Sequence, residues 1–556
     1  MLRKIHKLGL YALVFLSVFL LTGATAYAGS DLTPPRPEKA PRIDEVCTNL
    51  QPMLTWVNSE GGAPPRTYVL QLDTSSSFDS QELMEIPGIP EDAYVTAKRP
   101  EKPLRDNTQW FWRVKAVDSA GKVSSWSTEL GGITARFFLN TSWNERFAYV
   151  RVPARRIIAS MGYGVENIQD YDDGNQTHWK GASNHLSHWV QFDLGEPTPI
   201  SRIWLVCGMA GWKFRLPESV GWDSKQNLDG RLINYLWQYS NDGEKWIDIP
   251  ETERSMADAY RTVFEMDNKP VTARYFRLFI KKWYGSAPKV YEATFYREGQ
   301  PSVPEVPNAN YVLVISTVTG FQSEPGIVKT YFGKMIVGSS VSSDNYLGFL
   351  SAQVPPHWEL NVVEVPAHAF SVEVLKQMNP KPIAIFLTGS PNWFCQIPHF
   401  EFNGMFELVK TTDIPTYGAC AGMQLMMMGY GHTFARHTGR SYKTSDLKDI
   451  LEKDVPPIYI QKNDSIFAGM DNPFYGPEFH SWTVEVVEDD WEVLATSMDS
   501  KGFICNQVIR AINRPVYGVQ FHAEIPKPFN CAKGILMNFL SMAVERAKDQ
   551  GLWMEQ

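Results

Sequence analysis

The segment that most constrains this chain is Gly418-Ala419-Cys420-Ala421-Gly422, which lies between two apolar runs. The run before it, Ile414 to Tyr417, predicts a β-strand, and the run after it, Leu425 to Met428, predicts a helix. A strand that turns sharply into a helix strains its turn residue and needs small neighbours on both sides. The helix N-terminus beneath such a turn favours the thiolate form of the cysteine. Taken alone, the pattern fits a buried structural cysteine more often than a nucleophile.

A histidine and a carboxylate near the C-terminus change this interpretation. The run from Arg514 to Phe521 predicts a β-strand that delivers His522 and then Glu524. Strand residues two apart point to the same side, so the two side chains meet if the strand continues through Glu524. Otherwise a loop must bring the carboxylate round to the imidazole. A thiol nucleophile needs a base, and the base needs an acceptor on its other nitrogen, which Cys420, His522 and Glu524 together provide.

A third element is the apolar run Ala384 to Leu387, which predicts a strand that ends in the turn Thr388 to Pro391. A glycine-containing turn of this kind can aim backbone N–H groups at a developing oxyanion. It supplies the remaining requirement of an acyl-transfer site.

Together these motifs resemble the class I glutamine amidotransferase family over about residues 310–548. Gly418 to Gln424 matches the family's Gly-x-Cys-x-Gly-x-Gln. Gly518 to Glu524 matches its Gly-x-Gln-Phe-His-Pro-Glu, with Ala523 in place of the proline. The oxyanion turn, usually Gly-Gly-Pro, is Gly389-Ser390-Pro391 here. The replaced proline loosens the loop before the glutamate without removing a reacting group.

The resemblance implies a thioester mechanism on a small-molecule or peptide amide. In this mechanism Cys420 attacks a glutamine-like or γ-glutamyl amide, His522 moves the proton, and Glu524 orients His522. The backbone around Gly389 and Ala421 stabilises the oxyanion, and no cofactor takes part in catalysis.

Two more residues are candidate substrate contacts by the same resemblance, Gln424 and Ser481. In the family the backbone of the stretch around Ser481 helps to hold the glutamine α-amino and carboxylate groups. A helix-capping or packing role is the alternative for both residues.

The first residues, Met1 to Ala28, predict a secretory signal that directs the chain to the periplasm, the cell surface or the medium. Basic residues precede an apolar run from Leu8 to Leu21, and Ala26-Tyr27-Ala28 forms a small-x-small cleavage site. The run is short for a membrane span, although an uncleaved anchor is the alternative, so we expect no transmembrane span after cleavage. Cleavage removes three of 53 basic residues, which leaves 50 against 61 acidic residues and a net charge of −11. That balance argues against nucleic acid as a partner.

A chain of 556 residues predicts about three or four domains. Residues 29–42 are rich in proline and charge and predict a linker. Residues 43–137 contain short alternating strands separated by turn signals, which predict a β-sandwich. The run from Trp110 to Trp126 resembles a fibronectin type III domain, whose aromatic residues we expect in the core. We interpret this domain as a spacer.

Residues 138–298 predict a second β-sandwich. Its motifs run from Asp173 to Trp179, through His188 to Gly195, to a closing strand at Val290 to Tyr296. This order resembles the discoidin, or coagulation factor V/VIII type C, family of jelly rolls. Bacterial relatives are often carbohydrate-binding modules, so the resemblance implies a glycan or cell-surface polysaccharide as partner.

The same resemblance suggests two sites in this module. Trp212 and Trp222 lie in a long loop and are candidate glycan contacts, because aromatic rings stack on sugars, although tryptophans that only pack are commoner. Relatives hold a buried structural calcium, which makes Asp173, Thr177 and Glu292 candidate oxygen ligands. Hydrogen bonding alone explains these three residues equally well.

Residues 299–309 contain three prolines and predict a linker to the catalytic domain, residues 310–548. Apolar strands alternate with helices there, which predicts an α/β domain with a mainly parallel sheet and a site at the strand C-termini. The whole fold is then two β-sandwiches, fibronectin type III-like and discoidin-like, followed by an α/β domain with a cysteine nucleophile elbow.

The sequence therefore predicts an exported cysteine-dependent amidohydrolase that a carbohydrate-binding module targets. No synthase domain or Walker-type phosphate loop is visible in the sequence, so hydrolysis, as in secreted γ-glutamyl hydrolases, fits better than biosynthetic transfer. A non-catalytic glycan-binding protein with an amidotransferase-like scaffold is the alternative. A third hypothesis is another thiol chemistry on the same fold, such as amide cleavage in cell-wall material.

Overall fold

A computed structural model of the chain describes most of its residues. The described residues are 31–37, 45–47, 49–92, 95–106, 108–127, 135–139, 148–169, 178–183, 186–207, 230–255, 261–317, 353–389, 399–430, 435–436, 457–478, 480, 482–484, 487, 489–498, 504–525 and 531–555. Within these ranges no helix has the length and apolar character needed to cross a bilayer. The chain divides into two compact units, residues 1–140 and 141–556.

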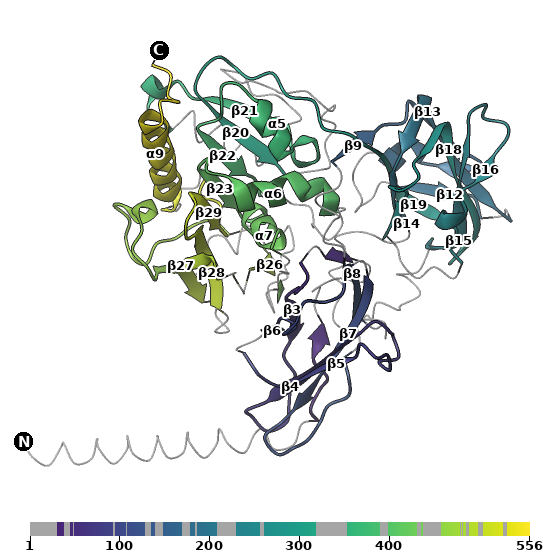
Figure 1. The fold of residues 1–556 in the computed structure, drawn as a ribbon, viewed down its shortest axis with the longest axis horizontal. Helices are drawn as coiled ribbons and strands as arrows, with labels where there is room; N and C mark the ends of the chain where they lie inside the picture. Colours follow the sequence, from purple (N-terminus) through teal and green to yellow (C-terminus); the bar gives the residue numbers. More distant parts are fainter. Residues whose placement is uncertain are drawn as a thin grey trace, which may run out of the picture. The chain divides into compact units, whose positions relative to one another are not determined.

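The first unit is built from two sheets around one core (Figure 1). The three-stranded sheet has the order β1 (Arg36–Pro37), β3 (Leu54–Val57), β6 (Val95–Lys98). The five-stranded sheet has the order β2 (Glu45–Cys47), β8 (Ala135–Leu139), β7 (Thr108–Val117), β4 (Thr67–Asp73), β5 (Met84–Pro90). Trp56 and Trp112 are fully buried in the shared core, where we expected the aromatic residues.

The linker predicted over residues 29–42 needs a correction. Arg36 and Pro37 pair with Trp56 and Val57, and Leu32 belongs to the core of the first unit. Part of the predicted linker is therefore a strand of this sheet-rich region. That residues 43–137 belong to the fibronectin type III family stays a prediction.

The second unit begins with another pair of sheets that share one core. The five-stranded sheet has the order β10 (Arg156–Ala159), β13 (His188–Ile200), β18 (Val271–Trp283), β15 (Leu232–Ser240), β16 (Ile247–Asp248). The other sheet has the order β11 (Gly162–Tyr163), β12 (Trp179–Gly181), β19 (Lys289–Glu298), β14 (Arg202–Cys207), β17 (Arg261–Glu265), and β9 (Tyr149–Val152) also pairs with β19. All these pairings are antiparallel, as in the predicted β-sandwich.

The rest of the second unit contains an eight-stranded sheet. Its order is β21 (Asn361–Pro366), β20 (Tyr311–Ser316), β22 (Ala384–Leu387), β23 (Thr416–Ala419), β29 (Val516–Val519), β28 (Ile504–Ala511), β27 (Trp491–Met498), β25 (Ile458–Ile460). The first five strands are parallel, and the last three add antiparallel pairs at one edge. A two-stranded sheet pairs β24 (Ala435–Arg436) with β26 (Trp482–Thr483).

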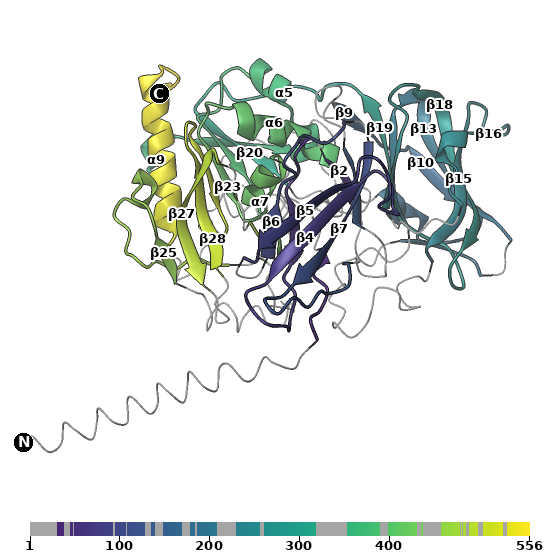
Figure 2. The ribbon, with the colours of Figure 1, turned by 60° about the horizontal axis from the view of Figure 1, so that its bottom comes forward.

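Helices cover both faces of this sheet (Figures 1 and 2). One face packs on helices α5 (Val372–Gln377), α6 (Asn403–Thr411) and α7 (Ala421–Met428), and the other on α9 (Lys533–Asp549). The central strand β20 alternates between them: Leu313 joins the first core and Val312 and Val314 the second. Because both faces are buried, the parallel strands are mainly apolar, as the sequence predicted.

Candidate active site

Three neighbouring strands bring the predicted catalytic motifs together. Gly389 follows β22 by two residues, Cys420 follows β23 directly, and His522 lies three residues beyond β29. The order of these strands in the sheet is β22, β23, β29, and all three are parallel. Because the carboxyl ends of parallel strands lie at one edge of a sheet, segments far apart in the sequence meet there.

Cys420 is held in a strained turn between β23 and α7. Its φ is 50° and its ψ is −106°, a region that L-residues rarely adopt. The flanking glycines are needed for close backbone approach: a Cβ on Gly422 would lie 2.4 Å from the carbonyl oxygen of Leu387, and one on Gly418 would lie 2.9 Å from the carbonyl carbon of Gly422. The expectation of small neighbours is therefore met. The cysteine is a free thiol with 5% of its surface exposed.

His522 lies between the sulfur and a buried carboxylate. Its Nδ1 is 2.7 Å from Oε1 of Glu524, which leaves Nε2 as the nitrogen that can serve the thiol. Burial alone lowers the pKa of His522, but the Glu524 carboxylate and the Cys420 sulfur together raise this pKa well above its usual range. The environment thus stabilises an imidazolium beside the sulfur.

A loop, not a strand, delivers the carboxylate. Strand β29 ends at Val519, and a turn in which the Ile525 N–H donates to the His522 carbonyl follows. The His522 N–H donates to the carbonyl of Pro477, which anchors the segment. Of the two arrangements that the sequence left open, the loop is the one found.

The turn at Gly389 packs directly on the imidazole. A Cβ there would lie 2.6 Å from Cε1 of His522, so any larger residue would displace the imidazole. The Thr317 hydroxyl is within 3.1 Å of the Gly389 and Thr388 carbonyl oxygens, and the Thr317 N–H donates to Oγ1 of Thr388. Both threonines are fully buried. The sequence alone does not predict this support, because Thr317 is 72 residues away in the chain and no local motif marks it.

The predicted substrate contacts are only partly described. Ala421 is the first residue of α7 and is buried beside Cys420. Gln424 is 4% exposed, and its Nε2 is 3.4 Å from Oε1 of Gln520. Ser481 lies outside the described residues.

The candidate sites of the second sandwich mostly lie outside the described residues as well. This applies to Trp212, Trp222, Asp173 and Thr177. Glu292 is fully buried and its Oε1 accepts a hydrogen bond of 2.6 Å from Thr294. A buried carboxylate needs hydrogen bonds or a cation, so Glu292 fits both interpretations that the sequence left open. No cluster of metal-ligating side chains occurs among the described residues.

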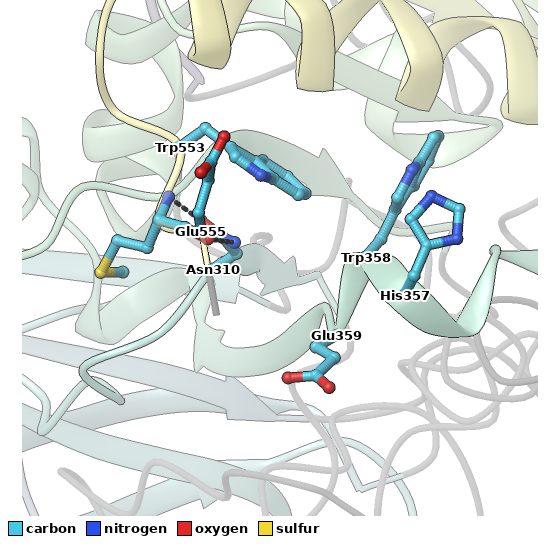
Figure 3. A pocket seen from close by; sticks show the side chains of 7 residues that line it. Asn310, His357, Trp358, Glu359, Trp553 and Glu555 are labelled. Carbon is cyan, nitrogen blue, oxygen red and sulfur yellow. Dashed lines mark hydrogen bonds between the residues drawn. The ribbon is translucent and has the colours of Figure 1, made fainter.

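A cavity of about 260 Å³ lies at the opposite end of the strands from Cys420, beside the N-terminal ends of β20 and β21 (Figure 3). The indoles of Trp358 and Trp553 stand on either side of it. The Asn310 side chain donates to the Met554 carbonyl and accepts from the Met554 N–H, which ties the C-terminal segment to the sheet. Because catalytic groups lie at the carboxyl ends of the strands, this cavity is not part of the Cys420 site.

Comparisons with known proteins identify two domains. A family model described as glutamine amidotransferase class-I matches residues 342–534. A model described as NedA-like, galactose-binding domain matches residues 171–278.

The curated relatives match through the first of these domains. The glutamine-hydrolyzing GMP synthase of Staphylococcus aureus (strain MSSA476) is 29% identical over 182 residues, which cover 33% of this chain and 31% of that protein. The glutamine-hydrolyzing GMP synthase subunit of Methanothermobacter thermautotrophicus is 32% identical over 135 residues, 23% of this chain and 61% of that protein. The chain thus spans less than two thirds of the length of either relative.

Two solved structures also resemble parts of the chain. A GMP synthase subunit from Thermoplasma acidophilum aligns at 15% identity and a TM-score of 0.32, over 44% of this chain and all of that one. CpGH89CBM32-5 from Clostridium perfringens, solved in complex with GalNAc-β-1,3-galactose, aligns at 15% identity and a TM-score of 0.21, over 27% of this chain and all of that one.

The two matched ranges lie within the regions that resemble the class I amidotransferase and discoidin families, and they support these two resemblances. The chain therefore contains a class I glutamine amidotransferase domain over residues 342–534 and a galactose-binding, discoidin-like domain over residues 171–278.

Proposed function

We propose that the chain is an exported, cysteine-dependent amidohydrolase of glutamine-like or γ-glutamyl amides. The observation that carries this proposal is the placement of Cys420 at a strained turn beside His522, whose other nitrogen is held by Glu524. A nucleophile, a base and an orienting carboxylate in this order are the requirements of acyl transfer. The amidotransferase domain supports glutamine amidotransferase-like activity.

In the first half of the reaction, the Cys420 sulfur attacks the amide carbonyl carbon and the carbonyl electrons move to oxygen. The tetrahedral intermediate collapses when the C–N bond breaks, and His522 gives its proton to the departing nitrogen, so that ammonia or an amine leaves. The product is a thioester between Cys420 and the γ-carbonyl. The Glu524 carboxylate keeps the imidazole oriented throughout.

In the second half, water attacks the thioester carbonyl while His522 accepts a proton from it. The C–S bond then breaks, which releases a carboxylic acid and restores the thiolate. Backbone N–H groups around Gly389 and Ala421 stabilise the oxyanion in both halves, and Gln424 and Ser481 contact the substrate. Apart from the amide and water, these steps use only groups of this chain.

The galactose-binding domain is proposed to hold the enzyme near its substrate on a glycan or cell-surface polysaccharide. Trp212 and Trp222 are the proposed sugar contacts. Asp173, Thr177 and Glu292 are the proposed ligands of a structural calcium, which would stabilise the module and take no part in catalysis.

The experiment that tests this function measures the release of ammonia or amine from glutamine and from γ-glutamyl amides. We expect release by the wild type and a loss of roughly 10⁴-fold or more in Cys420→Ala, because the nucleophile is absent. Cys531→Ala is the matched control, since Cys531 is a free, exposed cysteine in the same domain. Release that survives in Cys420→Ala would rule out the thioester mechanism, and no release from any such amide would favour the non-catalytic scaffold.

A further inference from the structure

Three side chains form a row across the outer face of one sheet of the galactose-binding sandwich. Arg151 of β9 is directly opposite Tyr296 of β19, and Tyr296 is directly opposite Arg202 of β14. Paired residues in register share a face of the sheet, and core residues lie beside them along each strand. The outer face of an antiparallel sheet normally meets water. Yet the exposed fractions of Arg151, Tyr296 and Arg202 are 5%, 1% and 0%.

The amidotransferase domain covers this row with the short 3-10 helix η6 (His399–Phe402). Arg151 donates from Nε and Nη2 to the two carboxylate oxygens of Glu401, at 2.8 and 2.6 Å. The Tyr296 hydroxyl donates to the same carboxylate. Only 3% of the Arg151 side chain and 1% of the Glu401 side chain are exposed. A fork of two parallel hydrogen bonds fixes both the distance and the orientation of its partners.

Aromatic contacts surround the ion pair. The Phe400 ring lies 4.7 Å from the Tyr296 ring and 5.2 Å from the Tyr149 ring. The Arg202 guanidinium lies 5.0 Å from the Phe400 ring centre, and Asp267 binds that guanidinium from the side. This cation–π contact and the edge-to-face and tilted ring pairs close the interface around η6.

Helix η6, which the sandwich holds, is connected to Cys420 through two packed helices. Helix η6 is the first described element after Gly389 and runs directly into α6, which packs on α7. This packing is close, since a Cβ on Gly429 would lie 3.2 Å from Cα of Phe406. Helix α7 begins at the residue after Cys420. A shift of η6 therefore reaches the turn that carries the sulfur through two packed helices.

We propose that the galactose-binding sandwich is a fixed part of the catalytic unit, in which Arg151 and Tyr296 hold Glu401 and thereby position α6, α7 and Cys420. Arg151, Tyr296 and Glu401 are positioning residues and do not touch the substrate. The role of Cys420 as a nucleophile rests on the proposed function. A buried ion pair suits this role, because removing one partner leaves an uncompensated charge that only a rearrangement can relieve.

The test compares full-length variants by two rates measured at one temperature at which all are folded. The first is kcat for amide hydrolysis. The second is the rate at which the Cys420 sulfur displaces iodide from iodoacetamide to form a thioether, located by peptide mass spectrometry. The variants are Arg151→Met, Tyr296→Phe, which removes one hydroxyl, and the double variant Arg151→Met/Glu401→Leu. The double variant removes both charges of the pair, so it can be measured even if Arg151→Met, which leaves Glu401 unpaired, fails to fold.

We expect both rates to fall by about tenfold in Arg151→Met and in the double variant, with KM within about twofold of wild type, because small displacements of a reacting group are costly. In Tyr296→Phe both rates should fall by a smaller factor, because the Arg151–Glu401 pair remains. The matched control is Arg274→Met, which removes the half-exposed Arg274–Asp193 pair from the other sheet of the same sandwich and should change neither rate.

The two readouts separate this inference from the proposed function. If the wild type hydrolyses no amide but its Cys420 alkylation slows in Arg151→Met, the proposed function fails and the positioning role stands. If the folded variants alkylate and turn over at the wild-type rates and only melt at lower temperature, the ion pair is merely structural and the inference is wrong.

Discussion

Cys420 adopts a backbone conformation that the packing of its neighbours imposes. At a φ of 50° the Cβ of an L-residue approaches the carbonyl group of the preceding residue, and a residue held in such a sparsely populated region costs about 1–3 kcal/mol. The packing of β23, β22 and α7 supplies this energy, and the sulfur thereby faces the imidazole of His522. Strain of this kind supports the proposed role of Cys420 as the nucleophile.

This strain predicts that glycine at position 420 gives a more stable protein than alanine, which is the reverse of the usual order. Glycine normally destabilises a folded chain relative to alanine, but it adopts a positive φ without a Cβ clash. We therefore expect Cys420→Gly to have a free energy of unfolding about 1 kcal/mol higher than Cys420→Ala, measured by urea denaturation. Both variants should be inactive. Equal or reversed stabilities would mean that the turn is relaxed.

The Glu524 carboxylate predicts a pH dependence through His522. A histidine pKa raised in the folded state contributes stability that is fully present below its unfolded value of 6.5 and is lost as the pH rises through the folded-state pKa. Glu524→Gln removes one cause of the raised pKa. The variant's loss in free energy of unfolding should thus be largest near pH 6 and shrink at higher pH, with kcat lower by roughly 10²–10⁴-fold.

Urea denaturation at a series of pH values measures this difference. A loss that grows with pH would show that His522 is not held protonated by its neighbours. Activity retained in Glu524→Gln would remove the glutamate from the mechanism.

At the scale of the elements, the site depends on the close approach of α7 to β22. Gly422 lies in the first turn of α7, where a Cβ would meet the carbonyl oxygen of Leu387 at 2.4 Å. A backbone atom cannot give way as a side chain can. The helix therefore reaches its place beneath Cys420 only because this position has no side chain.

We expect Gly422→Ala to lower the free energy of unfolding by about 1–3 kcal/mol, although alanine usually stabilises a helix. Gly534→Ala in α9 is the matched control. A Cβ there has only ordinary contacts of 3.6 and 3.7 Å with Met470, so this variant should be neutral or more stable. Chemical denaturation compares the two, and a stabilising Gly422→Ala would contradict the packing described here.

The same elements show what the sequence could and could not predict. Local patterns were enough for the strand–turn–helix at Cys420, because apolar periodicity and two glycines lie within one short segment. Local patterns did not decide how Glu524 reaches His522, because a continued strand and a loop can both place these two side chains next to each other. The support of Gly389 by Thr317 and of η6 by Arg151 could not be predicted, because these contacts join residues 72 and 250 positions apart.

At the scale of the whole molecule, the second unit combines a galactose-binding domain with an amidotransferase domain. Each domain has its own hydrophobic core, and the two share the buried Arg151–Glu401 pair. In the proposed function, recognition of a glycan and hydrolysis of an amide are two activities on one framework.

These two activities should be separable by mutation. We expect the double variant Trp212→Ala/Trp222→Ala to lose retention on galactose-containing polysaccharide columns while it releases ammonia from free glutamine at the wild-type rate. Cys420→Ala should show the opposite pattern. Affinity chromatography and an ammonia assay on the same samples measure both. Full retention by the tryptophan variant would mean that the sugar contacts lie elsewhere.

The thioester is the intermediate that the proposed mechanism requires, and trapping it is the most direct measurement. Wild type mixed with glutamine, quenched in acid and digested should yield the Cys420 peptide carrying a γ-glutamyl group that hydroxylamine removes. The Cys420→Ala enzyme should yield no acylated peptide and no ammonia. Ammonia release from the wild type with no acyl group on Cys420, even under rapid quench, would contradict this mechanism.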